Sequence, residues 1–148
     1  MQVSKHISFE EATRSEKAEE LGIGNTPGPL QYEAMKLVAE KVFEPAREYM
    51  NEPLTVSSFF RSKSVNKLIG GAPTSQHLKG EAIDIKCSDN KKLFEFIKDN
   101  LDFDQLIYEF GSIYQPAWVH VSYSKNGNRK EVLRAKTVKG KTVYEKYN

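Results

Sequence analysis

The sequence has few of the residues that define several common classes of protein. Cys87 is the only cysteine among 148 residues, which excludes an intrachain disulfide and makes a cysteine-built metal site unexpected. No run of eighteen or more apolar residues occurs, so we expect no membrane-spanning helix. The segment Met1 to His6 contains neither an apolar signal core nor a cleavage site. We therefore expect a protein that is made in the cytoplasm without a signal peptide.

The composition is that of one soluble globular domain, which we place at residues 1–148. Hydrophobic residues make up 39% and charged residues 28% of the chain, and the net charge is only +2. The C-terminal segment, about residues 124–148, is strongly basic, with eight lysines and arginines against two glutamates. We interpret this segment as a solvated basic extension, and attraction to an anionic cell wall is the alternative. No nucleic-acid-binding motif accompanies the charge, so we expect no nucleic acid partner, and we expect a monomer.

Two of the three histidines stand in patterns that favour a metal site. His77 precedes a run from Glu81 to Cys87 in which apolar residues alternate, so that Asp84 lies on the exposed face of a predicted strand. His120 lies on the polar side of a second alternating run, residues 118–123. Two imidazoles and one carboxylate suit zinc, which takes three protein ligands in a catalytic site. The sequence therefore predicts one zinc ion per chain, bound by His77, Asp84 and His120.

The same residues carry a resemblance to a known family. Ser75-x-His77-x-x-Gly80-x-Ala82-x-Asp84, followed by an aromatic-rich strand that ends in His120, resembles the M15 family of zinc peptidases. That family holds D-Ala-D-Ala carboxypeptidases and phage endolysins that cut peptidoglycan stem peptides. The resemblance runs from about Lys5 to about Leu133. It implies zinc as the cofactor and the fold of the amino-terminal signalling domain of hedgehog.

Further residues are candidates for contacts with the substrate. Residues 57–62, which end in Arg61-Ser62, resemble the family's segment that bears a substrate-facing arginine. Arg61 directly follows a predicted strand, where a fixed guanidinium would stabilise developing negative charge, although a surface cation is the default alternative. Ser75 and Gln76 would either bind substrate or brace the loop that carries His77. Trp118, on the same strand face as His120, is a candidate for the wall of a substrate groove.

The general base is harder to assign. Family members commonly place an acidic residue a few positions before the last histidine ligand, where this chain has Ala117 and Trp118. In an antiparallel hairpin that pairs Glu109 with Trp118, Glu109 would lie diagonally from His120 on one side of the sheet. A slip of one residue would turn Glu109 away. We predict Glu109 as the base, with a loop residue such as Asp104, or no base at all, as the alternatives.

Periodicity and turn signals predict an α+β domain. We expect a mainly antiparallel sheet, with helices on one face and the zinc site on the other. Asn126-Gly127 is a turn signal that would return the chain from one strand into the next. The predicted helices cover residues 8–21, 30–50 with a kink at Pro45, 62–69 and 91–100, and the predicted strands cover residues 54–58, 81–87, 105–110, 117–123 and 131–137.

Together these features predict a zinc metallopeptidase that hydrolyses an amide bond in peptidoglycan stem peptides. It would be a D-Ala-D-Ala carboxypeptidase or an endolysin-type endopeptidase, with the attacking water activated by zinc and a glutamate. Without a signal peptide, it would reach the wall after holin release, after lysis or as a virion component. The alternative is a catalytically inactive, zinc-stabilised module that binds the cell wall or builds the virion. The lack of an acidic residue just before His120 supports that alternative.

Overall fold

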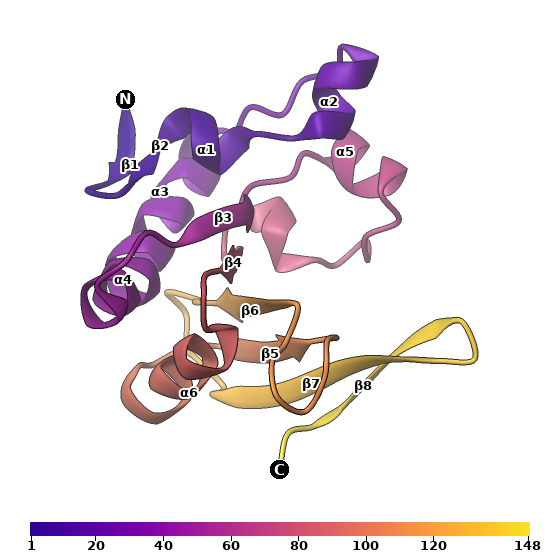
Figure 1. Ribbon diagram of the computed structural model, residues 1–148. Coiled ribbons are helices and arrows are strands. Elements are labelled where there is room, and N and C mark those ends of the chain that lie inside the picture. The colour runs from indigo at the N-terminus through magenta and orange to yellow at the C-terminus, as the bar shows by residue number, and fades with distance from the viewer.

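A six-stranded sheet crosses the molecule, and helices pack against it (Figure 1). The computed structural model describes all of residues 1–148. Its strand order is β3-β4-β6-β5-β7-β8, and a separate two-stranded sheet pairs β1 with β2. The strands are β1 (Gln2–Ser4), β2 (Ile7–Ser8), β3 (Thr55–Ser58), β4 (Ala82–Lys86), β5 (Gln105–Glu109), β6 (Trp118–Ser122), β7 (Glu131–Val138) and β8 (Lys141–Lys146). The fold class is therefore α+β, as predicted.

The sheet is mixed, which corrects the prediction of a mainly antiparallel sheet. β5 and β7 run parallel, with Gln105 opposite Glu131, whereas the other neighbours are antiparallel. Both edges of β6 are taken by β4 and β5, so the chain that leaves β6 must go to the free edge of β5. It arrives beside the start of β5, where the amide of Glu131 donates to the carbonyl of Asp104 over 3.0 Å. Asn126-Gly127 therefore lies in a crossover and not in a β6–β7 hairpin.

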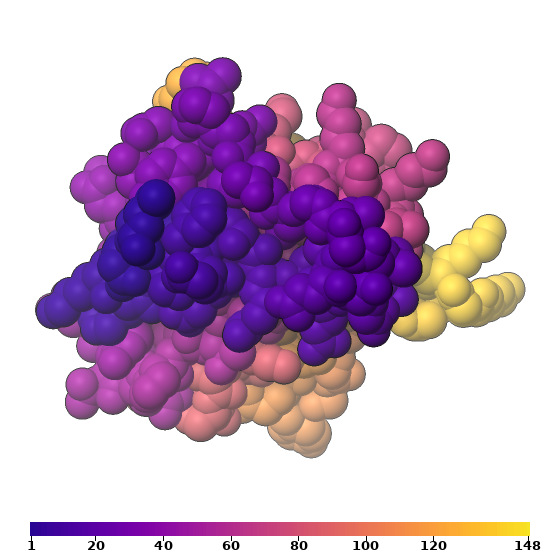
Figure 2. Space-filling model, turned by 90° about the horizontal axis from the view of Figure 1, so that it is seen from above, coloured from indigo at the N-terminus to yellow at the C-terminus, as the bar shows by residue number.

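The basic C-terminal segment carries two strands of this sheet. β7 was predicted, but β8 was not, because every residue of β8 is exposed and its sequence has no apolar alternation. β8 pairs with β7 over six residue pairs, from Leu133 opposite Lys146 to Val138 opposite Lys141. The β7–β8 hairpin projects beyond the body of the molecule, as both Figure 1 and Figure 2 show.

Local capping chemistry explains why the first predicted helix is divided. Ser8 and Glu11 form a capping box, and Gly22 ends the segment in the left-handed region. Between them Arg14 is extended and Ser15 caps a second helix by accepting a hydrogen bond from Ala18 N. The helical elements are α1 (Phe9–Thr13), α2 (Glu16–Leu21), α3 (Pro29–Val38), the π-helix η1 (Ala39–Phe43), α4 (Glu44–Met50), α5 (Lys63–Leu68), the 3-10 helix η2 (Gln76–Lys79) and α6 (Asn90–Asn100).

The predicted break at Pro45 takes the form of a π-helical turn. Proline has no amide hydrogen to donate, and a wider turn is one way to accommodate it inside a continuous helix. α3, η1 and α4 therefore form one irregular helical segment that packs on the sheet. None of the helices has both the length and the apolar character that a membrane crossing requires.

The hydrophobic core lies between one face of the sheet and the helices α3, α4 and α6. Ile83 and Ile85 of β4 and Val119 and Val121 of β6 are fully buried in it. Because side chains alternate along a strand, Asp84 and His120 point to the opposite face. The core thus determines which face of the sheet is left for polar chemistry.

Candidate metal centre

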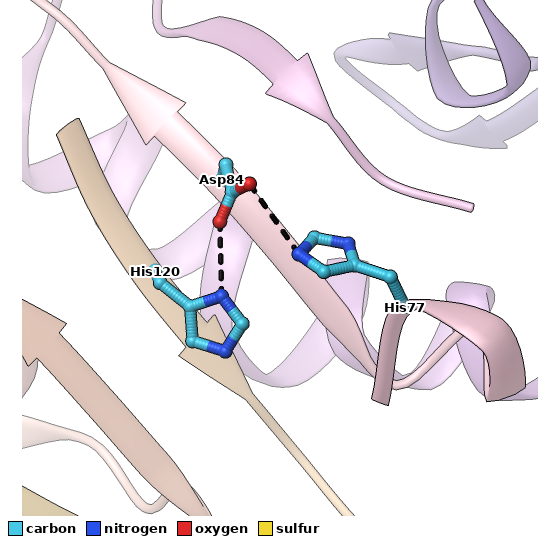
Figure 3. A group of neighbouring side chains, drawn as sticks. All are labelled: His77, Asp84 and His120. Carbon is cyan, nitrogen blue, oxygen red and sulfur yellow. Dashed lines mark hydrogen bonds and ion pairs between the residues drawn. The ribbon is translucent and has the colours of Figure 1, made fainter. Parts of the chain in front are cut away.

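Asp84 and His120 face each other directly across two neighbouring strands. β4 and β6 pair antiparallel with Asp84 opposite His120, as Figure 3 shows. Nδ1 of His120 lies 2.9 Å from Oδ1 of Asp84. A slip of one residue in either strand would turn its polar side chain into the core and its apolar neighbours outward, so the apolar residues specify this register.

His77 reaches the same point from the short helix η2. Ser75 caps η2, since its Oγ accepts a hydrogen bond from the amide of His77. Gly80 ends it with φ of 72°, and a Cβ at Gly80 would lie 2.5 Å from the carbonyl oxygen of Gln31 on α3. Gly80 is therefore needed both for the left-handed turn and for the close approach of α3.

The ring of His77 is oriented by a backbone carbonyl. Its Nδ1 lies 2.7 Å from the carbonyl oxygen of Phe59. A carbonyl only accepts, so Nδ1 carries the hydrogen and Nε2 presents its lone pair toward Asp84, 3.3 Å from Oδ2. A hydrogen bond from the outer nitrogen of a histidine to a carbonyl is the usual support for a metal ligand.

The donor set fits zinc in number, chemistry and spacing. One ligand atom from each of His77, Asp84 and His120 lies within 4.8 Å of the other two. Ligand atoms about 2.0–2.1 Å from a tetrahedral zinc are separated by roughly 3.4 Å, close to the two distances from Asp84 to the histidines. Burial disfavours ionisation of Asp84, but His77 and His120 hold its pKa well below its usual range. Burial lowers the pKa of His77, although the charge of Asp84 opposes this shift. The lowered pKa keeps the imidazole neutral, as a metal ligand must be.

Glu109 lies on the same face, one strand beyond His120. Strands β5 and β6 pair Glu109 with Trp118 and Ile107 with His120, so the predicted register is confirmed. Glu109 is only 7% exposed, and no hydrogen bond holds its carboxylate. Burial raises the pKa of Glu109 to about 7, with His120 opposing and Asp84 reinforcing the shift. A carboxyl group with a pKa near neutrality can both accept and release a proton.

These residues share a cleft of about 650 Å³. Its floor is formed by Asp84, His120, Ile107 and Glu109 from the three central strands, and His77 lies at its side. The ring of Trp118, tilted against that of Phe110 at 5.4 Å, also lines the cleft. A polar cleft with a triad of metal donors and a carboxyl group of raised pKa is suited to metal-assisted hydrolysis.

Comparison with protein families identifies the chain. The family model described as Peptidase M15 matches residues 5–122, which include all three metal donors and Glu109. The chain belongs to the Peptidase M15 family. A comparison with curated proteins finds no significant match. As an M15 peptidase the protein is a metallopeptidase, and the predicted family is confirmed.

In this peptidase Arg61 lines the cleft and is held there by Ser75. Its Nη2 donates to Oγ of Ser75 over 3.3 Å, and its Nε is buried without a hydrogen-bond partner. Burial lowers the pKa of Arg61 and the charge of Asp84 raises it. A guanidinium remains charged in either case, so Arg61 places a fixed positive charge beside the metal donors.

Asp104, considered above as an alternative base, is fully engaged elsewhere. Arg129 donates to both of its carboxylate oxygens at 3.0 Å, and Gln76 donates to Oδ2 at 3.0 Å. The hydrogen bonds from Arg129 lower the pKa of Asp104, although burial opposes them. Asp104 therefore works as an anchor, and Gln76 braces η2 through it. A substrate contact by Ser75 or Gln76 stays a prediction.

Three residues of the C-terminal strands line the cleft and were not singled out in the sequence. They are Leu133 of β7 with Thr142 and Tyr144 of β8. No family motif marks them, since the family match ends at Ser122, and β8 has no burial pattern to reveal it. Once the pairing of β7 with β8 is known, their common face follows from the alternation of side chains along each strand.

The raised pKa of Glu109 predicts a pH-dependent cost in stability. Between pH 4.5 and about 7 the metal-free folded protein keeps the Glu109 proton that the unfolded chain has lost, so its stability falls as pH rises. A shift of this size corresponds to about 3 kcal/mol. We expect Glu109→Gln to increase the free energy of unfolding of the metal-free protein by up to that amount at pH 8, and by little at pH 4.5. Urea unfolding at both values measures the difference, and an equal effect at both would contradict the assignment.

Proposed function

We propose that this M15 peptidase is zinc-dependent and hydrolyses an amide bond in peptidoglycan stem peptides. The supporting observation is one cleft that contains the His77, Asp84 and His120 donors together with a buried Glu109 whose pKa is raised to about 7. The family membership and the resemblance of the motif to wall-cutting M15 enzymes support the choice of substrate.

His77, Asp84 and His120 would hold the zinc ion. Two neutral imidazoles and one carboxylate leave a net charge of +1 on the site. Zinc bound there would supply a Lewis acid that polarises the scissile carbonyl and lowers the pKa of a water molecule. The carbonyl of Phe59 keeps Nε2 of His77 aimed at the site, and the β4–β6 register keeps His120 beside Asp84.

Glu109 would act as the general base and then as the general acid. In its ionised form it accepts a proton from the attacking water, and in its protonated form it gives that proton to the leaving amine. Its position beside the metal donors lets one group serve both the attack and the departure. With a cation held by the donors, Glu109 would favour its ionised form and would work as a base below pH 7.

Arg61 would have one of two roles. It would stabilise the negative charge that develops on the carbonyl oxygen during attack, or it would bind the carboxylate of a substrate. Its anchor, Ser75, directly precedes η2, so the guanidinium and His77 are positioned by the same loop. Because Arg61 lines the cleft, its guanidinium can meet an acceptor of the substrate there.

Such an enzyme would meet its substrate after holin release, after lysis or as part of a virion, as proposed for an endolysin-type peptidase. The eight lysines and arginines of residues 124–148 would attract the protein to an anionic wall.

Removal and return of the metal tests the proposed function. The protein is treated with a chelator, dialysed and incubated with purified murein, with and without added zinc. We expect no soluble fragments from the metal-free protein and restored hydrolysis with one zinc per chain. Mass spectrometry of the fragments identifies the bond that is cut. Hydrolysis that persists in the chelated protein would refute zinc dependence, and intact murein with the zinc-loaded protein would refute the substrate.

A further inference from the structure

A row of four side chains runs across the sheet from the active-site floor to the C-terminal hairpin. The register pairs Trp118 with Glu109, Glu109 with Ala135 and Ala135 with Tyr144. Residues paired directly on neighbouring strands share one face of the sheet. Ala135 is fully buried although its side chain is only a methyl group, so the larger neighbours in the row cover it. Tyr144 therefore faces the cleft on the far side of Glu109.

The hairpin forms one of two opposing walls of the cleft. Leu133, Thr142 and Tyr144 line it on the hairpin side, and the loop from Gly70 to Gln76 lines it on the other. In Figure 1 the turn of the hairpin projects on the side of the molecule where α5 and that loop lie. The loop is fixed from within, because Nδ2 of Asn66 donates to the carbonyl of Ala72 over 2.9 Å.

The side chain of Tyr144 is available to contact a ligand in the cleft. It is 55% exposed, and no side-chain hydrogen bond engages its hydroxyl. Burial, together with the negative charges of Glu109 and Asp84, raises its pKa, so the hydroxyl keeps its proton and can donate it in a hydrogen bond. An aromatic ring with a polar end is well suited to contact both the apolar and the amide parts of a peptide.

The cleft is long enough for several residues of substrate. It reaches from Arg61, which follows β3, to Tyr144 on β8, at opposite edges of the sheet. Neighbouring strands are about 4.8 Å apart, so five spacings on a flat sheet span about 24 Å. An extended peptide advances about 3.4 Å per residue, so roughly seven residues could cross the cleft. Three spacings, or about 14 Å, separate the backbone of β8 from that of β6, so Tyr144 lines the cleft on one side of the metal donors.

We propose that the β7–β8 hairpin is a substrate-binding wall and that Tyr144 is a specificity-determining residue for extended stem peptides. The inference rests on the proposed function. Its hydroxyl donates to an acceptor oxygen of the peptide on the hairpin side of the bond that is cut. Substrates that reach the hairpin are therefore preferred over short ones, which is the behaviour of an endopeptidase.

Kinetics with long and short substrates test the role of Tyr144. The zinc-loaded protein is assayed on soluble muropeptides with complete stem peptides and on the shortest fragment that it still cleaves. We expect Tyr144→Phe to lower the long-to-short ratio of kcat/KM about fivefold, the loss of one neutral hydrogen bond, mainly through KM. Tyr144→Ala should lower the ratio further because the ring is lost as well.

Two controls separate this role from a structural one. Tyr114→Phe changes the same atom in a residue that is 74% exposed and outside the cleft, and Val143→Ala changes the other face of β8. Both should keep the wild-type ratio. A Tyr144→Phe protein with the wild-type ratio, or with an equal loss on long and short substrates, would overturn the proposal.

A binding measurement distinguishes failure of this proposal from failure of the proposed function. Calorimetry with zinc-loaded Glu109→Gln protein should show muropeptide binding that the additional Tyr144→Phe substitution weakens about fivefold. Unchanged binding in the double variant overturns the role of Tyr144 even where wild-type hydrolysis of murein supports the proposed function. Absence of muropeptide binding overturns both.

Discussion

Asp84→Asn is expected to remove nearly all peptidase activity, with kcat/KM on murein peptides reduced by about 10³-fold or more. The substitution keeps the shape of the side chain but removes its charge, so the site becomes more positive and loses its only anionic donor. Asp84 also lies 3.3 Å from His77 and 2.9 Å from His120, so it is the donor that both rings adjoin. We therefore expect weaker zinc binding as well as lost turnover, and competition with a zinc-sensitive dye measures the first.

Asp102→Asn is the matched control, because Asp102 is exposed and outside the cleft. It should retain wild-type zinc affinity and activity. Circular dichroism should show that Asp84→Asn is folded. Wild-type zinc affinity in folded Asp84→Asn would argue against Asp84 as a ligand.

Glu109→Gln is expected to lower kcat by about 10²–10⁴ while leaving the zinc content at one per chain. Glutamine fills the same buried position and keeps its shape, but it cannot accept a proton from water. In the wild-type protein, kcat should fall on the acidic side as Glu109 becomes protonated, and this limb should be absent from the residual activity of the variant. Steady-state kinetics across pH 5 to 8, with metal analysis of each sample, measure both effects.

Glu95→Gln makes the same chemical change on the exposed side of α6 and should behave as wild type. Activity of Glu109→Gln close to that of the wild type would leave the protein without its proposed base. If the zinc-loaded wild type also failed to release fragments from murein, the zinc-stabilised binding module would be the better description.

The sequence carried enough information to place the candidate metal donors and Glu109 on one face of the sheet. Alternation of Ile83, Asp84 and Ile85 assigned Asp84 to the polar face of its strand, and the same period assigned His120. The pairing of Glu109 with Trp118 could be predicted because the two strands follow each other in the chain and the apolar residues of both must face one core. The starts of α1 and α6 are fixed locally, because the side chains of Ser8 and Asp89 accept hydrogen bonds from amides three residues further on. Local periodicity and local hydrogen bonding determined these features.

Only the tertiary structure decided the remaining features, because each depends on residues that are distant in sequence. The parallel pairing of β5 with β7 follows from the occupied edges of β6, and β8 has no burial pattern of its own. The carbonyl of Phe59 that orients His77 and the Arg129 that engages Asp104 come from other segments. The pKa of Glu109 likewise depends on how completely its neighbours exclude water. Burial and electrostatics are properties of the assembled fold, so the chemistry of Glu109 and the place of Tyr144 in the cleft emerge only there.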